Sequence, residues 1–283
     1  MYDELDRIIE LALIEDVGVA DITTEAIIPK GVKGRGIFLV KKAGIISGLY
    51  TAERVFKKVN DDIVFIPKKL DGSKVNYGDI VAEIEGEAAA ILTGERIALN
   101  FLQRMSGIAT LANEYQQLIK HTKAKIIDTR KTVPGLRILD KYAVKSGGCE
   151  NHRFGLYDMF LIKDNHISLK GSITNAVEAC KAYNKKHKKN FKIEVETTNL
   201  LQVQEALENY VDIIMLDNYS VEDMAEAIRF INNRCKVEAS GNVNFSTVKA
   251  IAETGVDYIS IGALTHSVKA LDISLEIEIY KED

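Results

Sequence analysis

The stretch FKIEVETTNLLQVQEALENYVDIIMLD, residues 191–217, decides the fold class of this chain. It contains two apolar runs typical of buried strands, at 191–196 and 211–217, and the residues between them have helical character. Alternation of strands and helices predicts a parallel sheet with crossover helices. The stretch therefore indicates a βα repeat of an α/β fold.

The same alternation continues on both sides of this stretch. Further strand-like runs lie at 125–129, 159–163, 235–240 and 257–262. The later runs end at residues 196, 217, 240 and 262, so their ends are 21, 23 and 22 residues apart. This repeat fits a barrel or an open doubly wound sheet. We favour the barrel, because barrels gather functional groups at the C-terminal ends of their strands and nearly every run here ends in one.

The first third of the chain has a different pattern of residues. Eight of the 19 glycines lie between Gly31 and Gly86, among short alternating runs at 36–40, 62–66 and 79–86. This pattern predicts a β-rich region. An amphipathic helix is expected at 1–16, and a long helix with Thr93 as its N-cap is expected to link the two parts.

Composition excludes several classes of protein. The 283 residues are 46% hydrophobic and 28% charged, which suits a globular core and excludes disordered and fibrous chains. The net charge of -4 leaves no basic footprint for nucleic acid. No apolar run approaches the roughly 20 residues of a membrane span. The acidic N-terminus lacks secretory features, and the three cysteines form no CxxC pair, so we expect a cytoplasmic protein without disulfides.

Small residues end the last two strand-like runs. Ser240, Gly241 and Asn242 end one of them, and Gly262 and Ala263 end the other. Backbone N–H groups at such turns bind anions, and barrels often bind phosphate at their last two loops. The sequence therefore predicts a phosphate site, although these residues also suit ordinary βα turns.

Arginines gather after the first of the six runs. The chain has 10 arginines among its 37 basic residues, and three of them, Arg130, Arg137 and Arg153, fall within 24 residues. Four more basic side chains lie in the same stretch: Lys131, Lys141, Lys145 and His152. A guanidinium binds carboxylate or phosphate bidentately, so we expect a planar or branched anionic ligand. The alternative is a solvated surface charge run.

Two acidic residues and a lysine also end strand-like runs. Glu196 and Asp217 predict a Mg²⁺ site completed by substrate oxygens, or stabilisation of a cationic sugar in a transition state. Both interpretations point to a phosphorylated sugar. The structural alternative is ion pairing of these carboxylates with Lys163 or Arg130. Lys163 also admits a rival chemistry, because a desolvated lysine in a barrel can form a Schiff base with a carbonyl substrate.

The block DTRKTVPGLRILDKYAVKSGGCENHRFGLYDMFLIKDNHI, residues 128–167, resembles the signature of the quinolinate phosphoribosyltransferase family. The resemblance covers nearly the whole chain and continues, in order, through 15–27, 94–110, 193–197, 213–218, 238–243 and 255–267. It implies an N-terminal α/β sandwich domain at 1–108 and a C-terminal open, TIM-like α/β barrel at 109–283, whose last segment packs back on the first domain. It also implies a homodimer in which each subunit completes the other's site.

The resemblance assigns a role to each candidate residue. The quinolinate pocket would comprise Thr129, Arg130, His152, Arg153 and Lys163, with Arg96 reaching in from the other subunit. Lys131, Glu196 and Asp217 would bind the ribose, the pyrophosphate and Mg²⁺, with Glu196 and Asp217 as the metal residues. The 5-phosphate would lie against Ser240, Gly241, Asn242, Gly262 and Ala263. The implied catalytic residues are Lys131, Lys163, Glu196 and Asp217.

The implied reaction is a Mg²⁺-dependent transfer in de novo NAD biosynthesis. The pyridine nitrogen of quinolinate displaces pyrophosphate from phosphoribosyl pyrophosphate (PRPP), and CO₂ is lost to give nicotinate mononucleotide. Two residues depart from the family pattern, since Cys149 and Asn242 stand where glycine is common. Asn tolerates positive φ, so the loop at 242 is expected to keep its shape. A paralogue from molybdate-uptake operons and a non-catalytic binder of anionic metabolites remain as alternatives.

Overall fold

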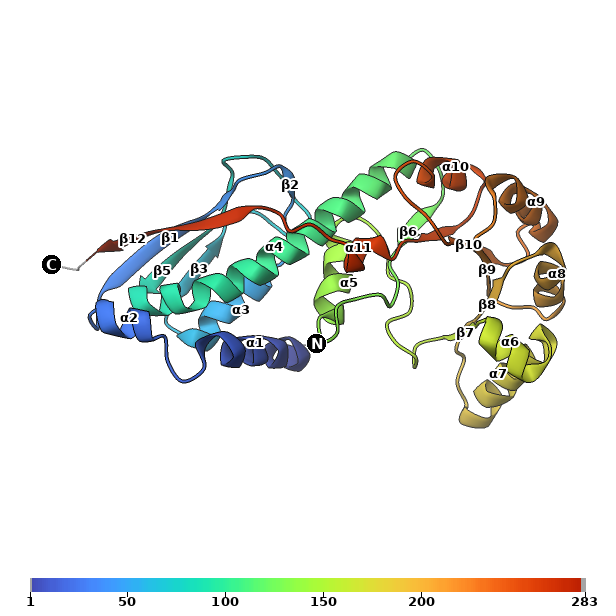
Figure 1. The fold of residues 1–283 in the computed structure, drawn as a ribbon, viewed down its shortest axis with the longest axis horizontal. Helices are drawn as coiled ribbons and strands as arrows, with labels where there is room; N and C mark the ends of the chain where they lie inside the picture. Colours follow the sequence, from blue (N-terminus) through green and yellow to red (C-terminus); the bar gives the residue numbers. More distant parts are fainter. Residues whose placement is uncertain (1, 281–283) are drawn as a thin grey trace. The chain divides into compact units, whose positions relative to one another are not determined.

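The computed structural model describes residues 2–280, which fold into two compact units (Figure 1). The first unit comprises the chain up to Asn113, then Thr132–Gly148, and the residues from Leu264 onward. The second unit comprises Glu114–Lys131 and Cys149–Ala263.

The first unit is built on a four-stranded antiparallel sheet of order β12-β1-β5-β3. These strands span Ile273–Tyr280, Lys33–Val40, Ile80–Glu87 and Val64–Pro67 respectively. A separate two-stranded antiparallel sheet pairs β2 (Gly44–Ile45) with β4 (Lys74–Val75). The C-terminal strand pairs with β1 along its whole length, from Val40 opposite Ile273 to Lys33 opposite Tyr280.

Helices cover one face of this sheet. They are α1 (Tyr2–Val17), α2 (Ile22–Ile27), α3 (Leu49–Val59) and α4 (Ala88–Ile119), and the unit also holds α5 (Arg137–Ser146). On the covered face, the rings of Phe38 and Phe65 contact each other and Phe56 of α3, at centroid distances of 5.5 to 6.3 Å. Alternate residues of β1 point to the opposite face, as the period of a strand requires.

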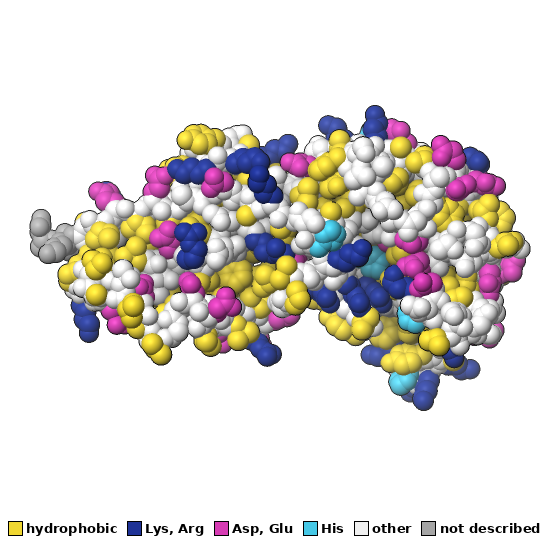
Figure 2. Space-filling view, in the orientation of Figure 1, with side chains coloured by type: hydrophobic (Ala, Val, Ile, Leu, Met, Phe, Trp, Pro, Cys, Tyr) yellow, Lys and Arg dark blue, Asp and Glu magenta, His cyan; other side chains and the backbone are white. Residues whose placement is uncertain are grey.

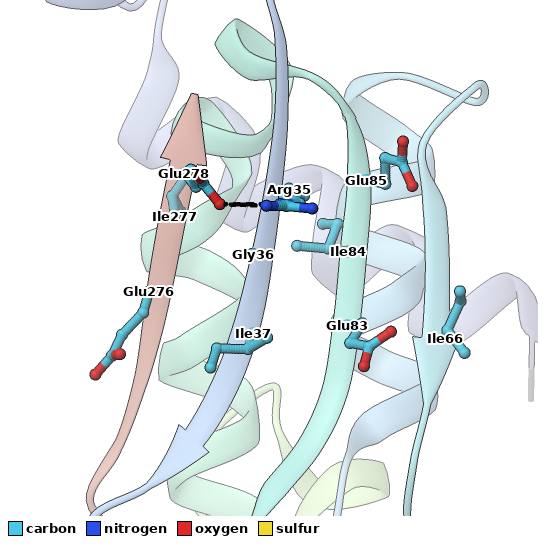
Figure 3. A pocket seen from close by; sticks show the side chains of 10 residues that line it. All are labelled: Arg35, Gly36, Ile37, Ile66, Glu83, Ile84, Glu85, Glu276, Ile277 and Glu278. Atoms are coloured by element: carbon cyan, nitrogen blue, oxygen red, sulfur yellow. Dashed lines mark hydrogen bonds and ion pairs between the residues drawn. The ribbon is translucent and has the colours of Figure 1, made fainter. Parts of the chain in front are cut away.

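That opposite face carries a shallow pocket, shown in Figure 3. Its charged lining consists of one guanidinium and four carboxylates: Arg35, Glu83, Glu85, Glu276 and Glu278. Arg35 donates hydrogen bonds to Glu278, so its charge is already compensated within the sheet. The pocket is therefore acidic, and it does not suit an anionic ligand.

Both helices expected from the sequence are present, but the predicted start of the second helix was wrong. The predicted N-terminal helix is confirmed by α1. Thr93 is not an N-cap, because α4 already begins at Ala88, directly after β5. The Ala88 N–H donates to Val32 O, which satisfies it without a capping side chain. Thr93 Oγ1 instead donates to Asp21 Oδ2, the side chain that caps α2.

The second unit contains a six-stranded parallel sheet of order β6-β11-β10-β9-β8-β7, which forms an open α/β barrel. The strands are β6 (Lys125–Ile127), β7 (Phe160–Ile162), β8 (Ile193–Thr197), β9 (Ile213–Asp217), β10 (Lys236–Ser240) and β11 (Tyr258–Ser260). All six strand-like runs of the sequence are thereby confirmed. Glu150 extends the sheet beyond β6 through a parallel bridge to Ile127. Within the described residues, no ladder joins this edge to β7 at the other end.

Helices follow the strands in the pattern expected of βα repeats. They are α6 (Asp164–Lys170), α7 (Ile173–His187), α8 (Leu200–Glu208), α9 (Val221–Ile231), α10 (Val248–Glu253) and, at the unit boundary, α11 (Ala263–His266). Ser172, Asn199 and Ser220 cap α7, α8 and α9 by accepting a hydrogen bond from a backbone N–H of the first turn. In the described part of the chain, we find no helix with the length and apolar character of a membrane span.

Candidate active site

The C-terminal edge of the parallel sheet brings most candidate residues together. Because all six strands are parallel, the residues at or just after their C-terminal ends share one edge. The candidates at this edge are Thr129, Arg130, Lys131, His152, Arg153, Lys163, Glu196, Asp217, Ser240, Gly241, Asn242, Gly262 and Ala263. Their common location fits a single site, although the role of each residue stays a prediction.

Four basic candidates belong to the first unit instead. Arg96 is exposed on α4, and Arg137, Lys141 and Lys145 lie on α5. Arg137 donates to Thr132 Oγ1, and Lys141 is buried. The basic cluster seen in the sequence is thus divided between the two units.

Lys163 and Glu196 form an ion pair between two strand ends. Lys163 follows β7, Glu196 lies near the end of β8, and the Nζ–Oε2 distance is 2.5 Å. The Lys163 backbone N–H also donates to His166 Nδ1 at the start of α6. An ion-paired ammonium is not a nucleophile, so this geometry does not favour the Schiff-base chemistry. It suits a lysine that places positive charge beside a substrate.

Asp217 is linked to the predicted phosphate loop through Asn218. The Asn218 side chain donates to Asp217 Oδ2 (2.8 Å) and accepts from Asn242 Nδ2 (3.0 Å). The Asn218 N–H donates to Ser240 O. These bonds link the C-terminal ends of β9 and β10.

Backbone conformation explains the small residues of this loop. Gly241 has φ +92°, and a Cβ atom there would lie 2.2 Å from Asn218 Oδ1. Asn242 adopts φ +52°, which confirms that asparagine can replace glycine at this position. Cys149 follows Gly148, whose φ is +89°, and is itself absent from the described residues with positive φ. The turn before His152 therefore does not require glycine at 149.

Two arginines at this edge lie close enough to affect each other. Burial lowers the pKa of Arg153, and the charge of Arg130 lowers it further. Arg153 also donates to Met159 O (3.2 Å). Figure 2 shows Lys, Arg and His side chains on the visible face of the second unit, in the right half of the view. Because like charges repel, an anion bound near both guanidinium groups would be favoured.

His152 lies inside the barrel, in contact with two glutamates that sequence reasoning missed. Its Nε2 is 2.9 Å from Glu194 Oε2 and 3.4 Å from Glu238 Oε2. Glu194 and Glu238 are fully buried on β8 and β10. Their potential metal-ligand atoms and that of His152 all lie within 4.8 Å of one another. A sequence signal was available, since each glutamate interrupts one of the apolar runs at 191–196 and 235–240, two residues before the run ends.

This cluster holds a proton at neutral pH. Burial disfavours charge on His152, but hydrogen bonds to Glu194 and Glu238 outweigh it and raise the pKa of the imidazole to about 10. Burial, followed by the Glu238 carboxylate, raises the pKa of Glu194 to about 7. The Arg153 N–H lies 2.7 Å from His152 Nδ1. At neutral pH the buried cluster retains a proton that the imidazole shares with the two glutamates.

Two family models match the chain in succession. Residues 21–106 match the N-terminal domain of quinolinate phosphoribosyl transferase, and residues 108–276 match its C-terminal domain. The chain belongs to the quinolinate phosphoribosyltransferase family.

Individual relatives resemble the chain over nearly its whole length. It is 44% identical to quinolinate phosphoribosyltransferase [decarboxylating] 1b of Nicotiana tabacum, over 98% of this chain and 83% of that protein. It is 41% identical to the probable nicotinate-nucleotide pyrophosphorylase [carboxylating] of Bacillus subtilis (strain 168), over 99% of this chain and 95% of that protein. The crystal structure of NadC from Streptococcus pyogenes has a TM-score of 0.94 at 39% identity and covers 99% of both chains.

Membership of the quinolinate phosphoribosyltransferase family confirms the resemblance seen in the sequence, including the expected open barrel. Plant relatives include proteins named as mitochondrial and as chloroplastic. The cytoplasmic location expected for this chain therefore stays a prediction.

Proposed function

We propose that this protein transfers the phosphoribosyl group of PRPP to quinolinate and releases pyrophosphate and CO₂ to form nicotinate mononucleotide. Within the family, one structural observation supports the substrate assignment: Arg130, Arg153 and Lys163 all lie at the C-terminal edge of the same parallel sheet. Quinolinate is a flat pyridine dicarboxylate, and each of its carboxylates suits a planar guanidinium fork.

The ends of β10 and β11, which lie next to β6 in the sheet order, suit PRPP. The turn of Ser240, Gly241 and Asn242 leaves backbone N–H groups for the 5-phosphate, and Gly262 and Ala263 follow the neighbouring strand β11. Glu196 and Asp217 supply hard carboxylate oxygens, which fit Mg²⁺. A Mg²⁺ ion held by them together with substrate oxygens would stabilise the negative charge of departing pyrophosphate.

The protein's own groups account for the remaining chemistry. Arg130 and Arg153 orient the ring so that its nitrogen electron pair forms the bond to C1 of the ribose as the bond from C1 to pyrophosphate breaks. Glu196 and Asp217 favour the positive charge that develops on the sugar. When the 2-carboxylate leaves as CO₂, its bonding electrons remain on ring C2, beside the cationic nitrogen. The Lys163 ammonium favours this carbanion, which then takes up a proton.

Product formation tests this function directly. Purified protein incubated with quinolinate, PRPP and Mg²⁺ is expected to form nicotinate mononucleotide, detected by mass spectrometry, with an equal amount of CO₂. EDTA is expected to abolish both products. Absence of both from folded, dimeric protein would refute the substrate assignment and favour the molybdate-operon paralogue or the non-catalytic binder.

The proposed homodimer makes a prediction about mixed subunits. Arg96→Ala and Lys163→Ala are each expected to inactivate the enzyme, because Arg96 serves the partner's site and Lys163 serves its own. Co-expression of the two variants is expected to restore about a quarter of the wild-type activity per subunit, since half of randomly paired dimers are mixed and each has one intact site. No restored activity would contradict sharing of Arg96 between subunits.

The phosphate loop makes a separate prediction. Gly241→Ala is expected to raise the KM for PRPP at least about tenfold, because alanine is strained at this φ and its Cβ would displace Asn218. The KM for quinolinate is expected to change little. Gly171→Ala is the matched control, because Gly171 also has positive φ but its Cβ would meet no atom within 4 Å. Equal effects of both substitutions on PRPP would contradict the assignment of the loop.

A further inference from the structure

An aromatic stack holds the loop between β10 and α10 against helix α4. The rings of Phe245 and Tyr115 are nearly parallel, at an interplanar angle of 6°, and their centroids are 4.2 Å apart. Tyr115 lies in the part of α4 that belongs to the second unit, and it is only 4% exposed. Phe245 is 46% exposed, although it is a large apolar residue in a loop. Stacked rings attract each other beyond the effect of apolar burial, so this contact fixes the loop to the helix.

Hydrogen bonds within the loop connect Phe245 to the proposed phosphate turn. Asn244 Nδ2 donates to Asn242 O (3.3 Å), and Asn244 Oδ1 accepts from the Ser246 N–H (2.9 Å). The Asn244 N–H donates to Thr247 Oγ1 (3.0 Å). These bonds enclose Phe245 in a compact turn. A displacement of Phe245 would therefore also displace Asn242.

The backbone at Asn242 depends on such an anchor. Its φ of +52° is a left-handed conformation, which a residue other than glycine keeps only where surrounding contacts hold it. One contact is the hydrogen bond from Asn242 Nδ2 to Asn218 Oδ1, but this bond is exposed, so water competes for it. The stack of Phe245 on Tyr115 is a second contact, and Tyr115 is buried on a regular helix.

We propose that Phe245 and Tyr115 are positioning residues, whose stack holds the N–H groups of Gly241 and Asn242 in the arrangement that binds the 5-phosphate of PRPP. The two rings act through the backbone of the loop. This inference rests on the proposed function for its ligand, whereas the stack is a property of the protein without substrate. Loss of the stack is expected to weaken PRPP binding selectively, because the proposed quinolinate residues follow other strands.

Fluorescence measures the stack directly. The chain has no tryptophan, so Phe245→Trp introduces a single indole into the loop without background emission. Tyr115→Ala in the same protein is expected to raise the amplitude of the indole's nanosecond motion, measured by time-resolved anisotropy, about twofold. Equal mobility with and without Tyr115 would overturn the proposal. This readout needs no substrate, so it does not depend on the proposed function.

Binding and kinetics measure the consequence for the substrate. Phe245→Ala is expected to weaken the binding of ribose 5-phosphate, measured by isothermal titration, and to raise the KM for PRPP, each by about two- to tenfold. The KM for quinolinate is expected to stay within about twofold. Phe245→Tyr keeps a ring that can stack and is expected to recover most of the loss. Equal losses for both substrates, or no recovery with tyrosine, would indicate a merely structural role and overturn the proposal.

Another half-exposed aromatic residue provides the matched control. Phe230 on α9 is 44% exposed, and the Arg234 guanidinium lies 5.6 Å from its ring centroid. Phe230→Ala is expected to change neither the affinity for ribose 5-phosphate nor either KM. Wild-type protein that binds neither ribose 5-phosphate nor PRPP would overturn the proposed function and this proposal together. Wild-type affinity that is retained in Phe245→Ala would overturn this proposal alone.

Discussion

An Arg130→Ala variant is expected to bind quinolinate about a hundredfold more weakly than the wild-type protein. The substitution removes a guanidinium that is proposed to form two charge-assisted hydrogen bonds to one carboxylate, worth about 3 kcal/mol together. A loss of about 1.4 kcal/mol corresponds to a factor of ten in affinity. Arg130 lies in an exposed loop after β6, so the variant is expected to fold normally.

Isothermal titration with quinolinate, together with the KM for each substrate, measures this effect. The KM for PRPP is expected to stay within about threefold, since the proposed phosphate loop lies on other strands. Arg229→Ala is a suitable control, because Arg229 is also exposed but lies on α9. Unchanged quinolinate affinity in Arg130→Ala would remove Arg130 from the pocket.

An Arg104→Met variant is expected to lose about 3–5 kcal/mol of folding free energy in the first unit. Arg104 forms a bidentate ion pair with Asp140, at 3.0 and 2.9 Å, and donates a third hydrogen bond to Thr265 O. The Asp140 side chain is fully buried, so removal of the arginine leaves a carboxylate whose desolvation is no longer compensated by a cation.

Urea-induced unfolding measures this loss of folding free energy. Two further variants test whether the buried, uncompensated charge causes it. Arg104→Met combined with Asp140→Leu is expected to recover most of the stability, because an apolar pair carries no uncompensated charge. Arg35→Met removes an ion pair of 2.7 Å to Glu278, but that pair is about two-thirds exposed. This control is expected to cost at most about 1 kcal/mol. Equal losses in Arg104→Met and Arg35→Met would contradict the role of burial.

The sequence predicted those features that depend on local pattern. Each strand of the barrel appears in the sequence as a short apolar run. The end of the run marks the end of the strand, so Lys163 and Asp217 could be assigned to strand ends without knowledge of the tertiary structure. The turn at Asn242 was predictable for the same reason, since its conformation depends mainly on its own backbone. The family resemblance added the assignment of these residues to substrates.

Features that depend on contacts between distant segments were not predicted. Glu194 lies 42 residues from His152 in the chain, and only the curvature of the sheet brings the two together. Arg137 was grouped with Arg130 because the two lie only seven residues apart in the sequence. In the structure Arg137 belongs to a helix of the first unit, whereas Arg130 belongs to the second unit. Thr93 resembles a good N-cap locally, yet the chain enters α4 earlier because β5 ends at Glu87.

The pairing of β12 with β1 also governs the order in which the molecule can assemble during synthesis. Lys33 is synthesised 247 residues before its partner Tyr280. Most of the second unit is a continuous segment, Cys149–Ala263, and can fold while translation continues. Until residues 273–280 emerge, the nascent first unit exposes the unpaired edge of β1, where a chaperone or another nascent chain could bind.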